Sequence, residues 1–236
     1  MEMPGSKHID NSIYSGSMRG LSGKTAILFD ELERRFIYGT YKFGEIIPTA
    51  NIAKEFDVSR ATLTMALNHL RFEGYIEIVP QVGSRVVTPS DRQVHDYFIM
   101  FSLIEHQMAR FAAERRTPES LRDIEDICQR ITAMSERIVV PNYEFIDLID
   151  LYHMAIRRAA DSVMEVQRAS GYFRFAAFFL MNGKTINFSD VVRHSNRNRP
   201  FVTKYIAEGN VELAGEAMKK YILTGAPLDQ TNARVG

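Results

Sequence analysis

This sequence has almost no cysteine, no tryptophan and no excess of charge of either sign. Cys128 is the single cysteine among 236 residues, and there is no tryptophan. One cysteine excludes an intrachain disulfide framework and a cysteine-based zinc site. No apolar run reaches the roughly 18 residues that a membrane span needs, and residues 1–20 lack the apolar core of a signal peptide. We therefore expect a cytoplasmic protein without a membrane partner.

The charge of the chain is balanced both overall and locally. The 29 basic and 29 acidic residues give a formal net charge of zero, and residues 21–90 carry eight of each sign. Because DNA-binding domains are often basic, this count at first argues against a nucleic-acid partner. Any DNA binding has to rest on individually placed charges, which predicts weak non-specific affinity and a shallow salt dependence.

The composition is that of a globular protein, with 45% hydrophobic and 25% charged residues. The pattern of apolar residues predicts a mainly α fold in four segments. We expect a flexible arm at 1–21, a winged helix-turn-helix domain at 22–88, an all-helical bundle at 92–224 and a frayed tail at 225–236.

Residues 22–88 have the helix pattern of a DNA-binding unit. The first helix has apolar residues at every fourth position: Leu28, Leu32 and Phe36. A short helix over Thr49–Phe56 and a second helix capped by Ser59 are separated only by a tight turn. Two short helices at this spacing indicate a helix-turn-helix, which places its second helix in the major groove.

A hairpin wing is expected after the second helix. Its strands are predicted at Tyr75–Val79 and Arg85–Val87, with Gly83 allowing a close approach of the backbone and Arg85 near the tip. Arginine can bind guanine or phosphate, hydroxyl groups can bind phosphates or base edges, and methyl groups can touch thymine. The predicted DNA-binding residues are Ser59, Arg60, Ala61, Thr62, Thr64, Gly83 and Arg85.

These motifs together resemble the winged domain of GntR-type bacterial transcription regulators. The likeness lies in the runs Gly44–Ile47, Val58–Arg60, Glu73–Ile76 and Gly83–Val86. The helical remainder resembles the ligand-sensing (FCD) domain of the FadR/VanR branch, through Leu103–Glu105 and Ala207–Asn210. The resemblance implies a homodimer on a pseudo-palindromic operator in double-stranded DNA, with a small-molecule effector controlling its affinity. The family usually has Pro and Arg at Thr62 and Thr64, so a different operator preference is expected.

The resemblance also bears on the effector site. The family's sensing domain often holds a divalent metal through an Asp and three His residues. Here His153 matches the first His, Asp150 falls three residues before it instead of four, and Arg199 and Tyr221 stand at the other two positions. Because a cationic arginine cannot ligate a metal, the metal site is degraded and no metal cofactor is expected. Arg199 could instead grip a carboxylate or phosphate, so the predicted effector-binding residues of a small anionic organic ligand are Asp150, His153, Arg199 and Tyr221.

Several alternatives stay open. A divalent metal could be retained by Asp150, His153 and a displaced His194. Arg199 could also pack against Asp150 or glutamates, in a domain that senses nothing or binds a more apolar ligand. For the whole chain, the alternative is a helical protein-interaction module whose winged domain binds protein. No enzyme is expected, because no nucleophile with a base, phosphate-binding loop or paired-carboxylate site appears at a usable spacing.

Overall fold

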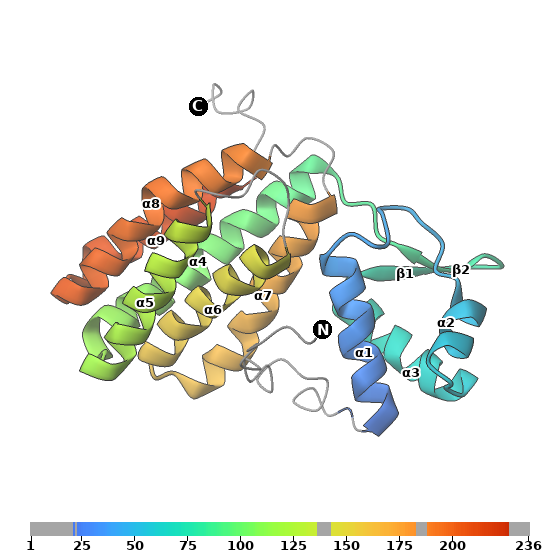
Figure 1. Ribbon diagram of the computed structural model, residues 1–236. Helices are drawn as coiled ribbons and strands as arrows, with labels where there is room; N and C mark the ends of the chain where they lie inside the picture. The colour runs from blue at the N-terminus through green and yellow to red at the C-terminus, as the bar shows by residue number, and fades with distance from the viewer. Residues whose placement is uncertain (1–20, 22, 136–142, 183–187, 227–236) are drawn as a thin grey trace, which may run out of the picture. The chain divides into compact units, whose positions relative to one another are not determined.

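The chain divides into two compact units, with the boundary between Thr88 and Pro89 (Figure 1). The computed structural model describes residues 21, 23–135, 143–182 and 188–226. Within these residues it contains nine helices and two strands, which confirms the predicted combination of a winged helix-turn-helix with an all-helical region. The predicted arm and tail lie outside the described residues, except for Leu21, Gly225 and Ala226.

The first unit has a hydrophobic core built around its first helix. Its elements are α1 (Gly23–Ile37), α2 (Thr49–Glu55), α3 (Arg60–Phe72), β1 (Ile76–Val79) and β2 (Gly83–Val86). The predicted apolar face of α1 is buried, with Leu28, Leu32 and Phe36 at most 1% exposed. Phe36 stacks on Tyr75 with ring centroids 5.8 Å apart, and α1 packs against α3. The core therefore fixes α3 relative to α1.

The wing is a two-stranded antiparallel hairpin whose second strand begins earlier than predicted. Val79 pairs with Gly83 and Glu77 pairs with Arg85, so the turn spans only residues 80–82. Gly83 has a φ of 112°, a backbone conformation that is open to glycine and strained for other residues. This glycine lets the strand start directly after the turn. Arg85 therefore lies within the strand and not near the tip, which corrects the prediction.

The second unit is a bundle in which α4 packs against four other helices: α6, α7, α8 and α9. Its helices are α4 (Asp91–Arg115), α5 (Pro118–Ser135), α6 (Tyr143–Ala159), α7 (Val163–Asn182), α8 (Phe188–Glu208) and α9 (Val211–Gly225). A capping box of Ser90 and Gln93 starts α4. None of the helices in the described ranges is long and apolar enough to cross a membrane.

Helix α8 continues through an internal proline, Pro200. Proline has no backbone N–H, so the carbonyl of Asn196 lacks the bond that residue 200 would ordinarily donate. This interruption falls beside Arg199, one of the predicted effector-binding residues.

Candidate functional site

Helix α3 has one buried face and one exposed face. Leu63, Ala66 and Leu70 point into the core of the first unit. The opposite side carries exposed residues of mixed chemistry: Arg60, Ala61, Thr64, Met65, Asn68 and Arg71. A helix with one exposed face of short polar, basic and methyl-bearing groups has the side chains that major-groove recognition requires.

The hydroxyl groups at the start of α3 already make hydrogen bonds within the helix. The Ser59 side chain caps the helix by accepting from the Thr62 amide at 3.1 Å, and the two hydroxyl oxygens lie 2.9 Å apart. The Thr64 hydroxyl donates to the Arg60 carbonyl at 2.8 Å. Thr64 therefore presents oxygen lone pairs and a methyl group outward. Among the predicted residues of α3, Arg60 is the strongest hydrogen-bond donor.

On the wing, Arg85 is engaged by a carboxylate. Its Nε and Nη2 donate to Glu77 Oε1 at 3.0 and 2.7 Å, across the strand pair. Two of the nitrogen donors of Arg85 are therefore already engaged within the wing. At Gly83 an added Cβ would meet nothing within 4 Å, so the positive φ is what requires glycine here.

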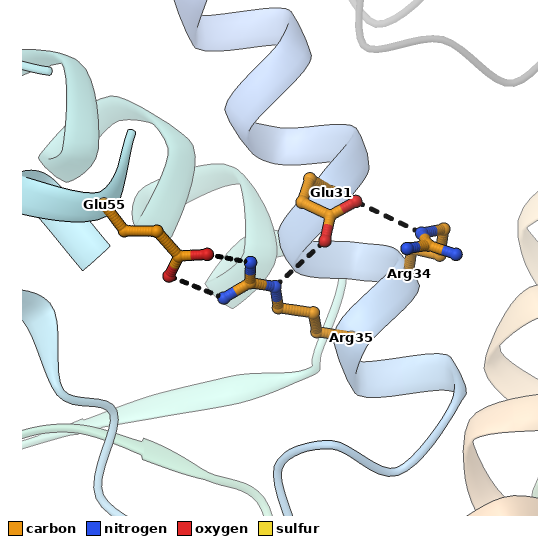
Figure 2. Close-up of polar contacts among 4 residues, drawn as sticks. All are labelled: Glu31, Arg34, Arg35 and Glu55. Atoms are coloured by element: carbon orange, nitrogen blue, oxygen red, sulfur yellow. Dashed lines mark hydrogen bonds and ion pairs between the residues drawn. The ribbon is translucent and has the colours of Figure 1, made fainter. Parts of the chain in front are cut away.

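An ion-pair network ties α1 to α2 (Figure 2). Nη1 of Arg35 donates to Glu55 Oε2 at 3.0 Å, Nη2 donates to Glu55 Oε1, and Nε donates to Glu31 Oε1 at 3.0 Å. Arg34 donates to the second oxygen of Glu31 at 3.1 Å. The Arg35 guanidinium also lies 5.1 Å from the ring centroid of Phe56. The C-terminal end of α2 is thereby fastened to α1.

This network shifts the ionisation of both carboxylates. Hydrogen bonds from Arg35 hold the pKa of Glu55 below its ordinary value. Partial burial alone would raise the pKa of Glu31, but hydrogen bonds from Arg35 and Arg34 outweigh it and lower the pKa. The hydrogen bond from Arg35 to Glu55 is also the main cause of the raised pKa of Arg35. All three groups are therefore charged at neutral pH.

Lys24 fastens the turn between α2 and α3. Its Nζ donates to the Asp57 carbonyl at 3.0 Å and lies 3.8 Å from the Asp57 carboxylate. Asp57 has a φ of 46°, in the left-handed region that side chains rarely adopt. Helix α1 thus holds the helix-turn-helix at two points, the end of α2 and the turn.

The ion pairs divide the eight basic residues of 21–88 into two groups. Four are paired with carboxylates: Lys24, Arg34, Arg35 and Arg85. Within the described residues the other four make no ion pair: Lys42, Lys54, Arg60 and Arg71. Local neutrality therefore leaves a small set of cations free to meet phosphates.

A buried charge cluster lies inside the second unit. Glu105 of α4 accepts from His153 Nδ1 and from Arg157 Nε, each at 2.7 Å, and all three residues are at most 2% exposed. Burial would raise the pKa of Glu105, but Arg157 and His153 outweigh it and lower the pKa. Burial lowers the pKa of His153, against the opposing effect of Glu105, so the ring is neutral at pH 7. A carboxylate can only accept, which puts the imidazole proton on Nδ1.

Arg199 of α8 is also completely buried but has no carboxylate partner among the described residues. Its Nη2 donates to Ser195 Oγ at 2.6 Å and to Asn196 Oδ1 at 3.1 Å, whereas Nε and Nη1 have no partner there. The ionised side chains that are fully buried in the described second unit are Glu105, Arg157 and Arg199. Of these three, Arg199 is the one without an oppositely charged partner in the described residues, and an unpaired buried charge is costly.

Three of the four predicted effector-binding residues come together. The rings of His153 and Tyr221 stack with centroids 5.8 Å apart, and the Arg199 guanidinium carbon lies 5.8 Å from the Tyr221 centroid. The fourth residue, Asp150, lies half-buried one turn before His153 on α6. Within the described residues Arg199 makes no ion pair with Asp150 or a glutamate, unlike the packing alternative.

The residues at this position do not fit a divalent metal. Among the described residues, no group of three His, Cys, Asp or Glu side chains could hold one. His194 is half-buried on α8, and its carbonyl accepts from Asn198 Nδ2 at 2.8 Å. A guanidinium stands where a third ligand would be needed, and it repels cations.

Sequence reasoning missed four polar residues at this site: Glu105, Arg157, Ser195 and Asn196. A signal existed for two of them. Glu105 interrupts the apolar face formed by Phe101, Met108 and Ala109, and Arg157 follows His153 by one helical turn. A charged residue on a buried face has to find a partner, so the pair was predictable in kind.

Comparison with known proteins supports the identification of the first unit as a DNA-binding winged helix-turn-helix. Residues 25–86 match the family model described as bacterial regulatory proteins, gntR family. A comparison with curated protein sequences found no match.

The fold resembles solved regulator structures over most of the chain. For E. coli McbR/YncC the TM-score is 0.72 at 16% identity, covering 86% of this chain and 95% of that one. For a transcriptional regulator GntR from Rhodococcus sp. RHA1 it is 0.69 at 17% identity, with the same coverage of 86% and 95%. At these identities the likeness concerns the fold, and it extends across both units.

Proposed function

We propose that this gntR-family transcription regulator binds a pseudo-palindromic operator as a homodimer, and that a small organic anion in its helical unit controls the affinity. The match of residues 25–86 to the gntR family model supports DNA binding by the winged unit. The buried Arg199, which has no carboxylate partner among the described residues, is the main observation that supports an anionic effector.

Operator recognition centres on α3. Arg60 stands at the first position of the helix, exposed and without an ion pair in the described residues, where it can reach a guanine or a phosphate. The oxygens of Ser59, Thr62 and Thr64 accept from cytosine or adenine amino groups, and Ala61 meets a thymine methyl. Gly83 and Arg85 contribute from the wing, where Arg85 has to share its donors with Glu77.

Further phosphate contacts come from cations that carry no ion pair. Lys42, Lys54 and Arg71 are exposed, and Lys54 lies on α2, the helix that crosses the DNA backbone in helix-turn-helix complexes. These contacts position the protein without reading sequence. Specificity then rests on few residues, of which Arg60 is the strongest.

The effector is expected to carry one negative group that meets Arg199. Tyr221 lies beside this guanidinium and stacks on His153, so the two rings orient the remainder of the ligand. A directly bound anion neutralises the buried charge without a metal. Effector binding then shifts the population of relative orientations of the two winged domains, and with it their match to half-sites about one DNA turn apart.

Selection from a pool of random duplex DNA with the full chain tests the operator proposal. The enriched sequences are expected to form an inverted repeat with half-site centres roughly 10 base pairs apart. The Arg60→Ala variant is expected to enrich nothing comparable. If the wild-type chain enriches no repeat, the operator proposal is wrong and a winged domain that binds protein gains support.

A further inference from the structure

The donors of Arg199 are occupied in a way that bears on how a ligand can enter. A guanidinium has two forks for a carboxylate, one formed by Nε and Nη2 and the other by Nη1 and Nη2. Nη2 belongs to both forks, and its two hydrogens already point at Ser195 Oγ and Asn196 Oδ1. A two-pronged carboxylate contact therefore needs one of these acceptors to leave.

We propose that Asn196 holds the place of the effector's carboxylate and is displaced from Arg199 when a monocarboxylate binds. This inference rests on the proposed effector role of Arg199 and deepens it. Arg199 carries one buried positive charge that no carboxylate among the described residues pairs with, which calls for one carboxylate. The rings of His153, Phe173 and Tyr221 beside it suit an organic acid with an apolar or aromatic body.

Asn196, and not Ser195, is the acceptor that gives way. Its bond to Nη2 is the longer one, 3.1 Å against 2.6 Å, and its side chain is only half-buried. Ser195 is 4% exposed and also donates to the Tyr221 hydroxyl at 3.3 Å. The backbone at Asn196 is weakened as well, because Pro200 cannot donate to its carbonyl.

The displacement reaches another helix. The Asn196 amide nitrogen donates to Ser135 Oγ, at the C-terminal end of α5. Asn196 thus joins Arg199 of α8 to α5. When a carboxylate takes its place on Nη2, this link between α5 and α8 is loosened. The effector's charge is thereby converted into a change in helix contacts.

Competition of this kind predicts an unusual mutational effect. Asn196→Ala removes the acceptor that the ligand must displace, so monocarboxylate binding should tighten by about tenfold, roughly the value of one charge-assisted hydrogen bond. If Asn196 instead held the ligand directly, the same change would weaken binding. Asn198→Ala is the matched control, because Asn198 is a buried asparagine of α8 that bonds His194 and Thr224.

The experiment is calorimetric titration of the full-length chain with benzoate and acetate, and with the neutral isosteres benzamide and acetamide. We expect the acids to bind, the amides to fail, Asn196→Ala to tighten acid binding and Asn198→Ala to leave it unchanged. Weakened or unchanged binding in Asn196→Ala overturns the displacement. Failure of both acids to bind either wild type or Asn196→Ala overturns it too.

The Arg199→Gln variant separates this inference from the proposed effector site. If acid binding is lost in Arg199→Gln but not tightened in Asn196→Ala, the site stands and the displacement fails. If Arg199→Gln binds benzoate as well as wild type does, the effector proposal itself fails. Operator binding, measured on the same variants without acid, tests the DNA-binding function independently of both.

Discussion

Arg35 of α1 and Glu55 of α2 form a two-pronged ion pair that fastens the first helix of the helix-turn-helix to the core (Figure 2). Helix α2 has seven residues, no side-chain cap at its N-terminus, and only Ile52 fully buried. Its packing alone gives it little hold. The ion pair therefore adds to the positioning of α2 and, through the turn, of α3.

Breaking this ion pair should weaken DNA binding without touching a DNA contact. We expect Arg35→Gln and Glu55→Gln each to lower the melting temperature and the operator affinity. The double variant should be no worse than Arg35→Gln alone, because Glu55→Gln removes only an interaction that Arg35→Gln has already removed. Arg34→Gln is the control, since Arg34 pairs only within α1. Additive losses in the double variant would show that the two residues act separately.

The same pair should give the stability of the protein a defined pH dependence. The folded-state pKa of Glu55 is lowered, so its stabilisation is fully present above the unfolded pKa and is lost as pH falls through the folded value. The difference in melting temperature between wild type and Glu55→Gln should be constant above about pH 5 and shrink at lower pH. In an Arg35→Gln background the difference should be absent throughout. A difference that grows as pH falls would contradict the pairing.

The sequence was sufficient to predict the fold because its signals were local. The buried face of α1, the Ser59 cap and the apolar face of α3 follow from helical periodicity and capping chemistry. The wing was misplaced by two residues because the positive φ of Gly83 decides where the second strand begins. A backbone conformation of one glycine cannot be read from hydrophobic pattern.

The functional site was less predictable because it depends on which charges pair. Sequence showed eight basic residues in the winged unit but not that half of them are held by carboxylates. Similarly, Arg199 and Arg157 are both buried arginines, and only their surroundings distinguish a paired cation from an unpaired one. Such pairings link residues far apart in the chain, beyond the reach of local pattern.

The division of cations predicts the salt dependence of operator binding. If the four cations without an ion pair in each winged unit each meet one phosphate, a dimer's slope of log K against log salt has a magnitude of about 7, at roughly 0.9 per phosphate contact. Lys54→Ala should reduce this slope by about 2 in the dimer. Arg34→Ala, which removes an exposed but paired cation, should leave it unchanged. Equal reductions in the two variants would show that the ion pairs open on DNA.

Arg60 and Arg85 should differ in their weight at the interface. Arg60→Ala is expected to weaken operator binding by about 1–3 kcal/mol and relax the preference at one base position. Arg85→Ala should cost less, because binding DNA through Arg85 first requires its hydrogen bonds to Glu77 to break. Fluorescence anisotropy on the selected operator and on single-base variants measures both. A larger loss of operator affinity in Arg85→Ala than in Arg60→Ala would show that the wing contributes more to recognition than α3.

Two buried arginines of the helical unit should respond oppositely to the same substitution. Arg157→Gln leaves Glu105 with its main cationic partner removed, and breaking a buried pair in this way costs about 3–5 kcal/mol. Arg199→Gln removes a charge that has no ion-pair partner among the described residues, so the dialysed protein should be as stable as wild type or more stable. Urea unfolding of the three proteins, with and without benzoate, measures the contrast. Benzoate should stabilise wild type but not Arg199→Gln. A large loss of stability in Arg199→Gln without benzoate would mean that the charge of Arg199 is already balanced inside the bundle.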